Sequence, residues 1–301
     1  MLSRLAESYF WLGRYLERAE ATTRLLAEHH QLMVEDQSVS ETLACAVLLE
    51  ALTLPHEEVS NADELVRSVV GNEENPSTII GSVAAARENA RAVRDSLSAE
   101  TFEALNSAYL SFVRGVVITS SPGVTLHRLM DRLLMVNGVV DWTMPRDEAY
   151  QFLVLGRELE RIDMVGRLLA VRHDQLWPSA GPSATLRAAG AQTAFLRSGA
   201  ALVGSQVRAY LVLDPVFPRS MRNCASDAED GVRALGRLGV RDRGALLREV
   251  GMLRSALEFE IDDDPASVDR LADEARQAAH RASDQVNATF FRQYGTIVWS
   301  H

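Results

Sequence analysis

The sequence predicts an all-α protein, a helical bundle built from two pseudo-repeated halves. Along almost the whole chain of 301 residues, apolar positions recur with helical spacing, and no segment alternates as a strand does. The nine prolines fall between these segments or at their starts, because helix interiors exclude proline. In addition, a segment near the N-terminus recurs about 143 residues later in the chain.

Breakers and capping residues set the boundaries of the individual helices. Ser98 stands before an apolar helical pattern that starts at Phe102, and we expect its side chain to cap that helix. Thr143-Met144-Pro145 marks the start of the second half. The expected helices run over 2–33, 39–53, 61–70, 77–96, 98–119, 124–141, 146–176, 184–211, 217–237, 242–261 and 266–293.

The duplication is clearest in two segments of nineteen residues. Residues 12–30 read LGRYLERAEATTRLLAEHH and residues 155–173 read LGRELERIDMVGRLLAVRH, which are identical at eleven positions. The chain therefore divides into a first repeat, 1–142, and a second repeat, 143–301, which we expect to form one compact unit. Two copies are too few for a solenoid. The positions shared by both repeats include Gly13/Gly156, Arg14/Arg157, Glu17/Glu160, Arg18/Arg161, Arg24/Arg167 and His30/His173.

Charged residues form a stripe along each of these two helices. One interpretation is a solvated helix face, with Glu20 and Arg24 paired at i,i+4. However, Phe10, Ala21 and Leu25 fall within the charged arc, and large apolar residues on both sides of a helix are typical of an enclosed one. We therefore favour arginine–carboxylate networks that are at least partly buried between helices.

Such a network is a candidate site, because carboxylates next to arginines can bind an anionic group, orient an amine or act as a general base. A second charged segment, ARENARAVRDSL, occupies the helix expected over 77–96. Within it, an asparagine in a helix interior suggests that its amide has a partner. The candidate catalytic residues are Glu17, Glu20, Glu160 and Asp163, and the candidate substrate-binding residues are Arg14, Arg18, Arg24, Arg157, Arg161, Arg167, Arg87, Glu88, Asn89 and Arg91.

Composition excludes several classes of site. All 31 basic residues are arginines. Because the chain has no lysine, it cannot form a lysine Schiff base, bind phosphate with a P-loop lysine or use a Ser-Lys dyad. Neither a zinc motif nor a Glu-x-x-His step occurs, and we predict no metal and no cofactor in this chain. Cys45 and Cys224 are expected to be core residues in a reducing compartment. The net charge of −10 argues against nucleic acid and membrane as partners, and the protein is expected to be cytoplasmic.

Most of the negative charge lies in one segment, residues 35–74, which holds ten carboxylates and one arginine. Solvation alone accounts for such a segment. A sharper interpretation is a surface that docks another protein, because charge asymmetry steers association.

Several segments together resemble the bacterial alpha-E domain family: LGRYLERAE, LGRELERID, ARENARAVRDSLS, LVLDPVFPRS and MLSRLAESYFW. The resemblance covers nearly the whole chain and implies an all-helical fold. It also implies an association with circularly permuted ATP-grasp ligases and transglutaminase-like proteins, in systems that make or modify peptides. Any ATP would then be bound by the partner, since this chain has no nucleotide motif. One departure is Asp163, which stands where the first repeat has Glu20.

Two functions follow as hypotheses. In the first, the chain is a helical component of an ATP-grasp-linked peptide-ligation system, and its charged clusters bind substrate or assist transfer. In the second, it is a non-catalytic scaffold that docks an ATP-grasp or transglutaminase-like partner, and the clusters join the two halves. A homo-oligomer is compatible with both. The two hypotheses differ in whether the clusters surround an open pocket or seal against each other.

Overall fold

The computed structural model describes residues 3–55, 59–115, 122–260 and 264–291. Within these ranges it is all-helical, without a strand, which confirms the predicted fold class. The helices are α1 (Ser3–Glu35), α2 (Glu41–Ala51), α3 (Ala62–Val70), α4 (Ile79–Ala92), α5 (Ala99–Gly115), α6 (Pro122–Thr143), α7 (Glu148–Ala170), α8 (His173–Leu176), α9 (Gly181–Ala188), α10 (Gln192–Ser198), α11 (Gly204–Leu213), α12 (Met221–Arg237), α13 (Gly244–Glu258), α14 (Pro265–Val286) and a π-helical turn, η1 (Asn287–Phe291).

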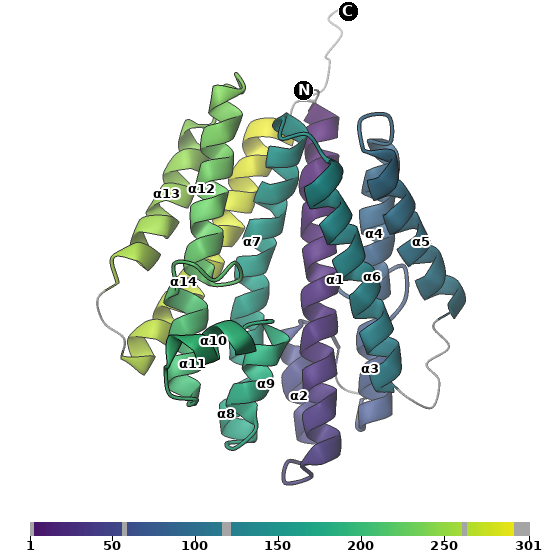
Figure 1. The fold of residues 1–301 in the computed structure, drawn as a ribbon, viewed down its shortest axis with the longest axis vertical. Coiled ribbons are helices and arrows are strands. Elements are labelled where there is room, and N and C mark those ends of the chain that lie inside the picture. The colour runs from purple at the N-terminus through teal and green to yellow at the C-terminus, as the bar shows by residue number, and fades with distance from the viewer. Residues whose placement is uncertain (1–2, 56–58, 116–121, 261–263, 292–301) are drawn as a thin grey trace, which may run out of the picture.

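Helices α1 and α7 lie side by side at the centre of the bundle (Figure 1). On one side of this pair, α4 and α6 pack against α1, and α5 packs against both of them. On the other side, α12 and α14 pack against α7, and α13 packs against both of these. The short helices α8 to α11 lie at one end of the molecule (Figure 1).

Glycines allow the two central helices to approach closely. A Cβ on Gly13 of α1 would overlap the carbonyl oxygen of Leu153 of α7. Conversely, a Cβ on Gly156 of α7 would overlap the carbonyl oxygen of Phe10 of α1. The two backbones therefore touch at a reciprocal crossing that any larger residue would force apart.

Two of the expected helices are wrong. The helix expected over 146–176 ends at Ala170, because Arg172 adopts a left-handed backbone with φ of +55° before α8 begins. The helix expected over 184–211 is three separate helices, α9, α10 and α11. Gly190 and Gly199 interrupt it with φ of +67° and +76°, a conformation that glycine adopts without strain.

The capping residues explain where several helices begin. The Ser98 side chain accepts a hydrogen bond from the Thr101 backbone N–H at 3.1 Å, as expected. Thr78 and Ser220 cap α4 and α12 in the same way, each accepting from a backbone N–H three residues later. Both cysteines, Cys45 and Cys224, are buried core residues, as predicted.

None of the helices in the described part of the chain is long and apolar enough to cross a membrane.

Candidate functional site

Two Glu-Arg pairs face each other where the central helices cross: Glu17-Arg18 on α1 and Glu160-Arg161 on α7. Arg18 Nε donates to Glu160 Oε1 at 2.6 Å, and Arg161 Nη2 donates to Glu17 Oε2 at 2.7 Å. Each glutamate is thus bound by the arginine of the opposite pair. This confirms the expectation of arginine–carboxylate contacts buried between helices rather than on a solvated face.

Both glutamates are fully enclosed, with no exposed side-chain surface. The second oxygen of Glu160 accepts from Arg14 Nε at 2.6 Å, and that of Glu17 accepts from Arg219 Nη1 at 2.6 Å. Burial opposes the charged form of Glu17, but Arg161 and Arg219 outweigh it and lower its pKa to about 2. Burial likewise raises the pKa of Glu160, but the charges of Arg14 and Arg18 outweigh this effect and hold the pKa below its ordinary value.

The network continues along α1 to Glu20, whose side chain is 2 % exposed. Arg219 bridges the two carboxylates of this helix, since its Nη2 donates to Glu20 Oε1 at 2.6 Å while its Nη1 binds Glu17. Arg24 also binds Glu20 Oε1, at 3.0 Å, which is the expected i,i+4 pair. Asn137 of α6 donates to the other oxygen of Glu20 at 2.5 Å.

Asp163 holds the corresponding place on α7. Arg167 Nε donates to Asp163 Oδ2 at 2.6 Å, and two groups of α14, Arg276 Nε and His280 Nε2, lie 3.3 and 3.2 Å from Asp163 Oδ1. Burial raises the pKa of Asp163, but the hydrogen bond to His280 and the charge of Arg167 more than reverse this, so the pKa lies well below its ordinary value.

Glu158 is a third buried carboxylate on α7, with a side chain 1 % exposed. It accepts from Arg157 Nε at 3.0 Å and from Arg161 Nη1 at 3.0 Å. Arg157 also binds Asp141 of α6 at 3.0 Å. Every charged residue predicted on the two repeated helices therefore makes an ion pair in one of three neighbouring groups, which we call together the network. These groups are centred on Glu160, on Glu17 with Glu20 and Glu158, and on Asp163.

The network leaves little space for a ligand. A pocket of about 20 Å³, lined by Glu17, Arg161 and Arg219 among others, lies against it, which is room for about one water molecule. All four oxygens of Glu17 and Glu160 are bound by arginines. A carboxylate with a pKa near 2 is also a weak general base at neutral pH. The geometry suits a sealed seam between two helices.

Comparisons with known proteins identify the family of this chain. Residues 1–291 match the model of the Alpha-E family, described as a predicted alpha-helical domain with a conserved ER motif. The chain belongs to the Alpha-E family. Its two Glu-Arg pairs, at 17–18 and 160–161, fit that description and are the pairs that exchange partners across the central helices.

Relatives of this Alpha-E chain carry no functional description. It is 27 % identical over 187 residues to uncharacterized proteins of Mycobacterium bovis and Mycobacterium tuberculosis. The match covers 52 % of this chain and 21 % of each relative, so the chain spans about a fifth of their length. No solved structure matches it.

The second predicted group of the Alpha-E chain lies apart from the network, on α4. Arg87 donates to Asn106 at 2.8 Å and lies over the Tyr109 ring, while Glu88 and Arg91 are mostly exposed and pair with each other at 3.1 Å. The expected partner of the Asn89 amide is the carbonyl of Ala85 in the same helix, at 2.9 Å. Among the described residues, no hydrogen bond joins this group to the network.

Several members of the network were not predicted from the sequence: Arg219, Asn137, Asp141, Glu158, Arg276 and His280. Arg219 lies within LVLDPVFPRS, a segment used only as a family mark. Asn137 and His280 stand at the spacing of 143 that relates the repeats, so the duplication itself carried the signal. The His280 ring is half exposed and binds Asp163.

Histidines form a separate buried cluster in the Alpha-E chain. The sequence aligned His30 with His173, yet the partner of His173 in space is His29, with His29 Nδ1 3.1 Å from His173 Nε2. His29 Nε2 lies 3.0 Å from the Ala44 carbonyl, so Nε2 donates there and Nδ1 accepts from His173. Burial lowers the pKa of His29 to about 4 and that of His173 to about 3, so both rings are neutral at pH 7.

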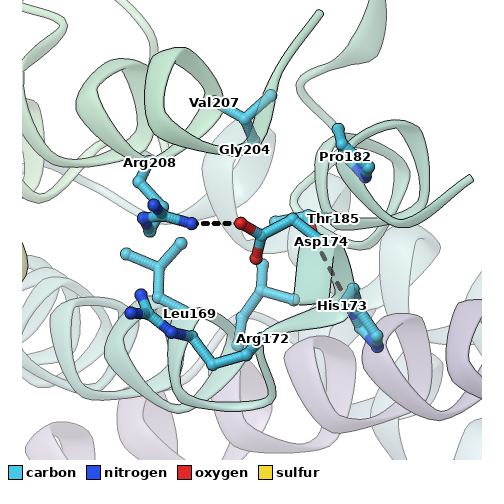
Figure 2. Close-up of a pocket in the computed structure, with 10 residues that line it drawn as sticks. Leu169, Arg172, His173, Asp174, Pro182, Thr185, Gly204, Val207 and Arg208 are labelled. Atoms are coloured by element: carbon cyan, nitrogen blue, oxygen red, sulfur yellow. Dashed lines mark hydrogen bonds and ion pairs between the residues drawn. The ribbon is translucent and has the colours of Figure 1, made fainter. Parts of the chain in front are cut away.

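Beside this cluster lies a pocket of about 10 Å³ (Figure 2). Figure 2 shows Arg208 pointing at Asp174, to which it donates at 2.5 Å, and Thr185 facing His173. Arg208 pairs with Asp174 inside this lining, whereas Arg172 pairs with Asp269 outside it. Among the described residues, no group of three histidine, cysteine, aspartate or glutamate side chains could hold a metal ion.

Proposed function

We propose that this chain is a non-catalytic helical scaffold in an amide-ligation system, in which the ATP-grasp ligase is a separate protein. One observation carries the proposal: the carboxylates of Glu17 and Glu160 are fully enclosed, and each of their oxygens is bound by an arginine. A working acid–base or substrate-binding site needs access that these groups lack.

The network would then act as a lock between two pseudo-repeated halves, 1–142 and 143–301. Equivalent contacts support this division. Arg18 reaches the Pro76 carbonyl and Arg161 reaches the Pro218 carbonyl, at 3.4 and 3.3 Å. Buried ion pairs seldom add net stability, but they specify which partner a buried group accepts. Crossed arginines therefore fix the register of α1 against α7.

A docking surface for the partner is offered by the acidic segment 35–74. The described carboxylates of α2, α3 and their flanking turns include Glu41, Asp63, Glu73 and Glu74, which are exposed. Such a surface attracts a basic patch and accelerates encounter more than it strengthens the complex. An ATP-grasp ligase or a transglutaminase-like protein would be the partner, with ATP bound on the partner rather than on this cytoplasmic chain.

A second candidate function keeps a role in chemistry for the network. The small pocket against Glu17, Arg161 and Arg219 favours it, since a substrate group could enter there if neighbouring side chains moved. In that case Glu17, Glu20, Glu160 and Asp163 would assist transfer, and the network arginines would hold an anionic substrate.

The deciding experiment measures ATP turnover and amide formation by the ATP-grasp partner with amino-acid and peptide mixtures, with and without this chain. A scaffold predicts that wild-type chain and folded Glu17→Gln chain support the same turnover. A working site predicts that Glu17→Gln abolishes product while the chain stays folded, and this result would overturn the scaffold.

Docking is tested on the same partner by titration at two salt concentrations. The triple variant Asp63→Asn, Glu73→Gln, Glu74→Gln should slow association severalfold at low salt, because it removes three charges of the acidic surface. The matched control removes three exposed carboxylates of α14 with Asp273→Asn, Glu274→Gln and Asp284→Asn. If the two variants slowed association equally, the net charge of the chain, rather than the acidic segment 35–74, would set the association rate.

A further inference from the structure

A pocket lined by apolar and charged side chains lies beside the Asp163 end of the network, where α2, the end of α7, α8 and α14 meet. This pocket has a volume of about 440 Å³. Val47, Ala51, Val171 and Leu176 supply an apolar wall, and Arg172 and Arg276 supply two guanidinium groups. A volume of this size and a mostly apolar lining with a few polar groups are typical of sites for small molecules.

Arg276 is held at the pocket by a specific arrangement. Its Nε lies 3.3 Å from Asp163 Oδ1, and its aliphatic stem crosses α7 at Gly166, where a Cβ would overlap the arginine Cδ. The equivalent positions of the first repeat are Thr23 and Leu133, so this feature belongs to the second repeat alone. Both Nη groups of Arg276 make no hydrogen bond with a described residue, which leaves them available to a ligand.

Arg172 approaches the pocket from a strained backbone. Among the described residues, three that are not glycine have positive φ, and two of these, Arg172 at +55° and Thr53 at +57°, line this pocket. A β-branched residue in this conformation is a genuine outlier, and such strain gathers at ligand sites. Arg172 Nη1 binds Asp269 at 2.9 Å, and no hydrogen bond to a described residue uses its Nε or Nη2.

We propose that this pocket binds a small organic molecule with a single carboxylate and an apolar body. Arg172 and Arg276 would bind the carboxylate, because a planar guanidinium matches its two oxygens. The apolar body would lie on Val47, Ala51 and Leu176. Glu50 lines the same pocket and is exposed, so it would repel a second negative charge and disfavour phosphate. This site is independent of the scaffold role and of any protein partner.

The test uses ligand-observed saturation-transfer NMR on the full chain with 4-methylvalerate, hexanoate and benzoate. The neutral 4-methylvaleramide, which has the same apolar body, and inorganic phosphate serve as comparisons. We expect saturable binding of at least one carboxylate, with binding of the amide and of phosphate about tenfold weaker or undetectable. The proposal would be overturned if none of the three carboxylates bound, or if the amide or phosphate bound as tightly as the carboxylates.

Variants locate the binding within the chain. Arg276→Met should weaken it by about tenfold or more, since it removes a charged donor. Because Arg276 also contacts Asp163, a second variant, Ala170→Phe, fills the pocket from an exposed position and leaves Arg276 and Asp163 unchanged. Arg270→Met on the exposed face of α14 is the control and should bind as the wild type does. Binding unaffected by either pocket variant would overturn the assignment.

Discussion

Gly13 of α1 lies directly against the backbone of Leu153 of α7, so that a Cβ on the glycine would overlap the leucine carbonyl oxygen. Gly156 meets Phe10 in the same way from the other helix. Both obstacles are backbone atoms in central helices, which cannot turn aside as a flexible side chain can. The crossing point of the bundle therefore depends on two glycines that the duplication preserves.

Gly13→Ala should lower the free energy of unfolding by about 3 kcal/mol or more, because α1 and α7 must separate to admit the methyl group. Urea unfolding followed by circular dichroism measures the loss. Gly138→Ala in α6 is the matched control, since nothing lies within 4 Å of a Cβ there. That control should gain about 0.5–1 kcal/mol from helix propensity. Similar effects at both positions would contradict the close crossing.

Glu160→Gln should cost about 3–5 kcal/mol of stability, because it leaves the buried Arg14 and the partly buried Arg18 without their shared counter-charge. Glu17→Gln should cost a similar amount. The control is Glu88→Gln, since Glu88 is 61 % exposed, and its effect should stay within about 0.5 kcal/mol. Chemical denaturation of the three variants measures these differences. If Glu160→Gln left the stability unchanged, the network would not be what holds α1 against α7.

Arg219 should couple strongly to Glu20. A double-mutant cycle with Arg219→Met and Glu20→Gln should give a coupling energy of about 1–3 kcal/mol, because both groups are largely buried and 2.6 Å apart. The reference cycle uses Arg270 and Glu274, an exposed pair 3.9 Å apart, and should give about 0.5 kcal/mol or less. If the two cycles gave the same coupling, Arg219 would not be a member of the network.

The His29–His173 pair should make stability fall as the pH drops below about 6.5. Burial holds the pKa of His29 at about 4 and that of His173 at about 3, so the unfolded chain binds more protons than the folded chain in this range. Stability conferred by the neutral rings is complete above their ordinary pKa and is lost on acidification. Each ring should contribute a slope of at most about 1.4 kcal/mol per pH unit.

Urea midpoints between pH 7.0 and 5.5 measure this slope above the range in which Glu17 titrates. His173→Gln should flatten the slope, whatever it costs at pH 7. His127→Gln should not, because the His127 side chain is 81 % exposed. A wild-type slope in the His173→Gln chain would refute the buried neutral pair.

The repeated sequence carried most of the central network. Charged positions that recur at a fixed spacing, together with apolar residues on the same helix face, were enough to predict that Glu17, Glu20, Glu160 and Asp163 lie among arginines. Helix spacing also predicted the Glu20–Arg24 pair, since residues four apart are neighbours on one face. The broken helix over 184–211 was missed, because glycine in a helical pattern does not say whether it will end the helix.

The amino-acid sequence by itself determined the helical fold, the two-fold repetition of the charged helix and the absence of lysine chemistry, since these depend on local periodicity and residue type. Only the tertiary structure decided that each glutamate binds the arginine of the opposite pair, that Arg219 and His280 join them and that His29 rather than His30 meets His173. Such contacts join residues more than a hundred positions apart, and their geometry depends on how closely two helices can pack. That distance is set at Gly13 and Gly156, where the backbones touch.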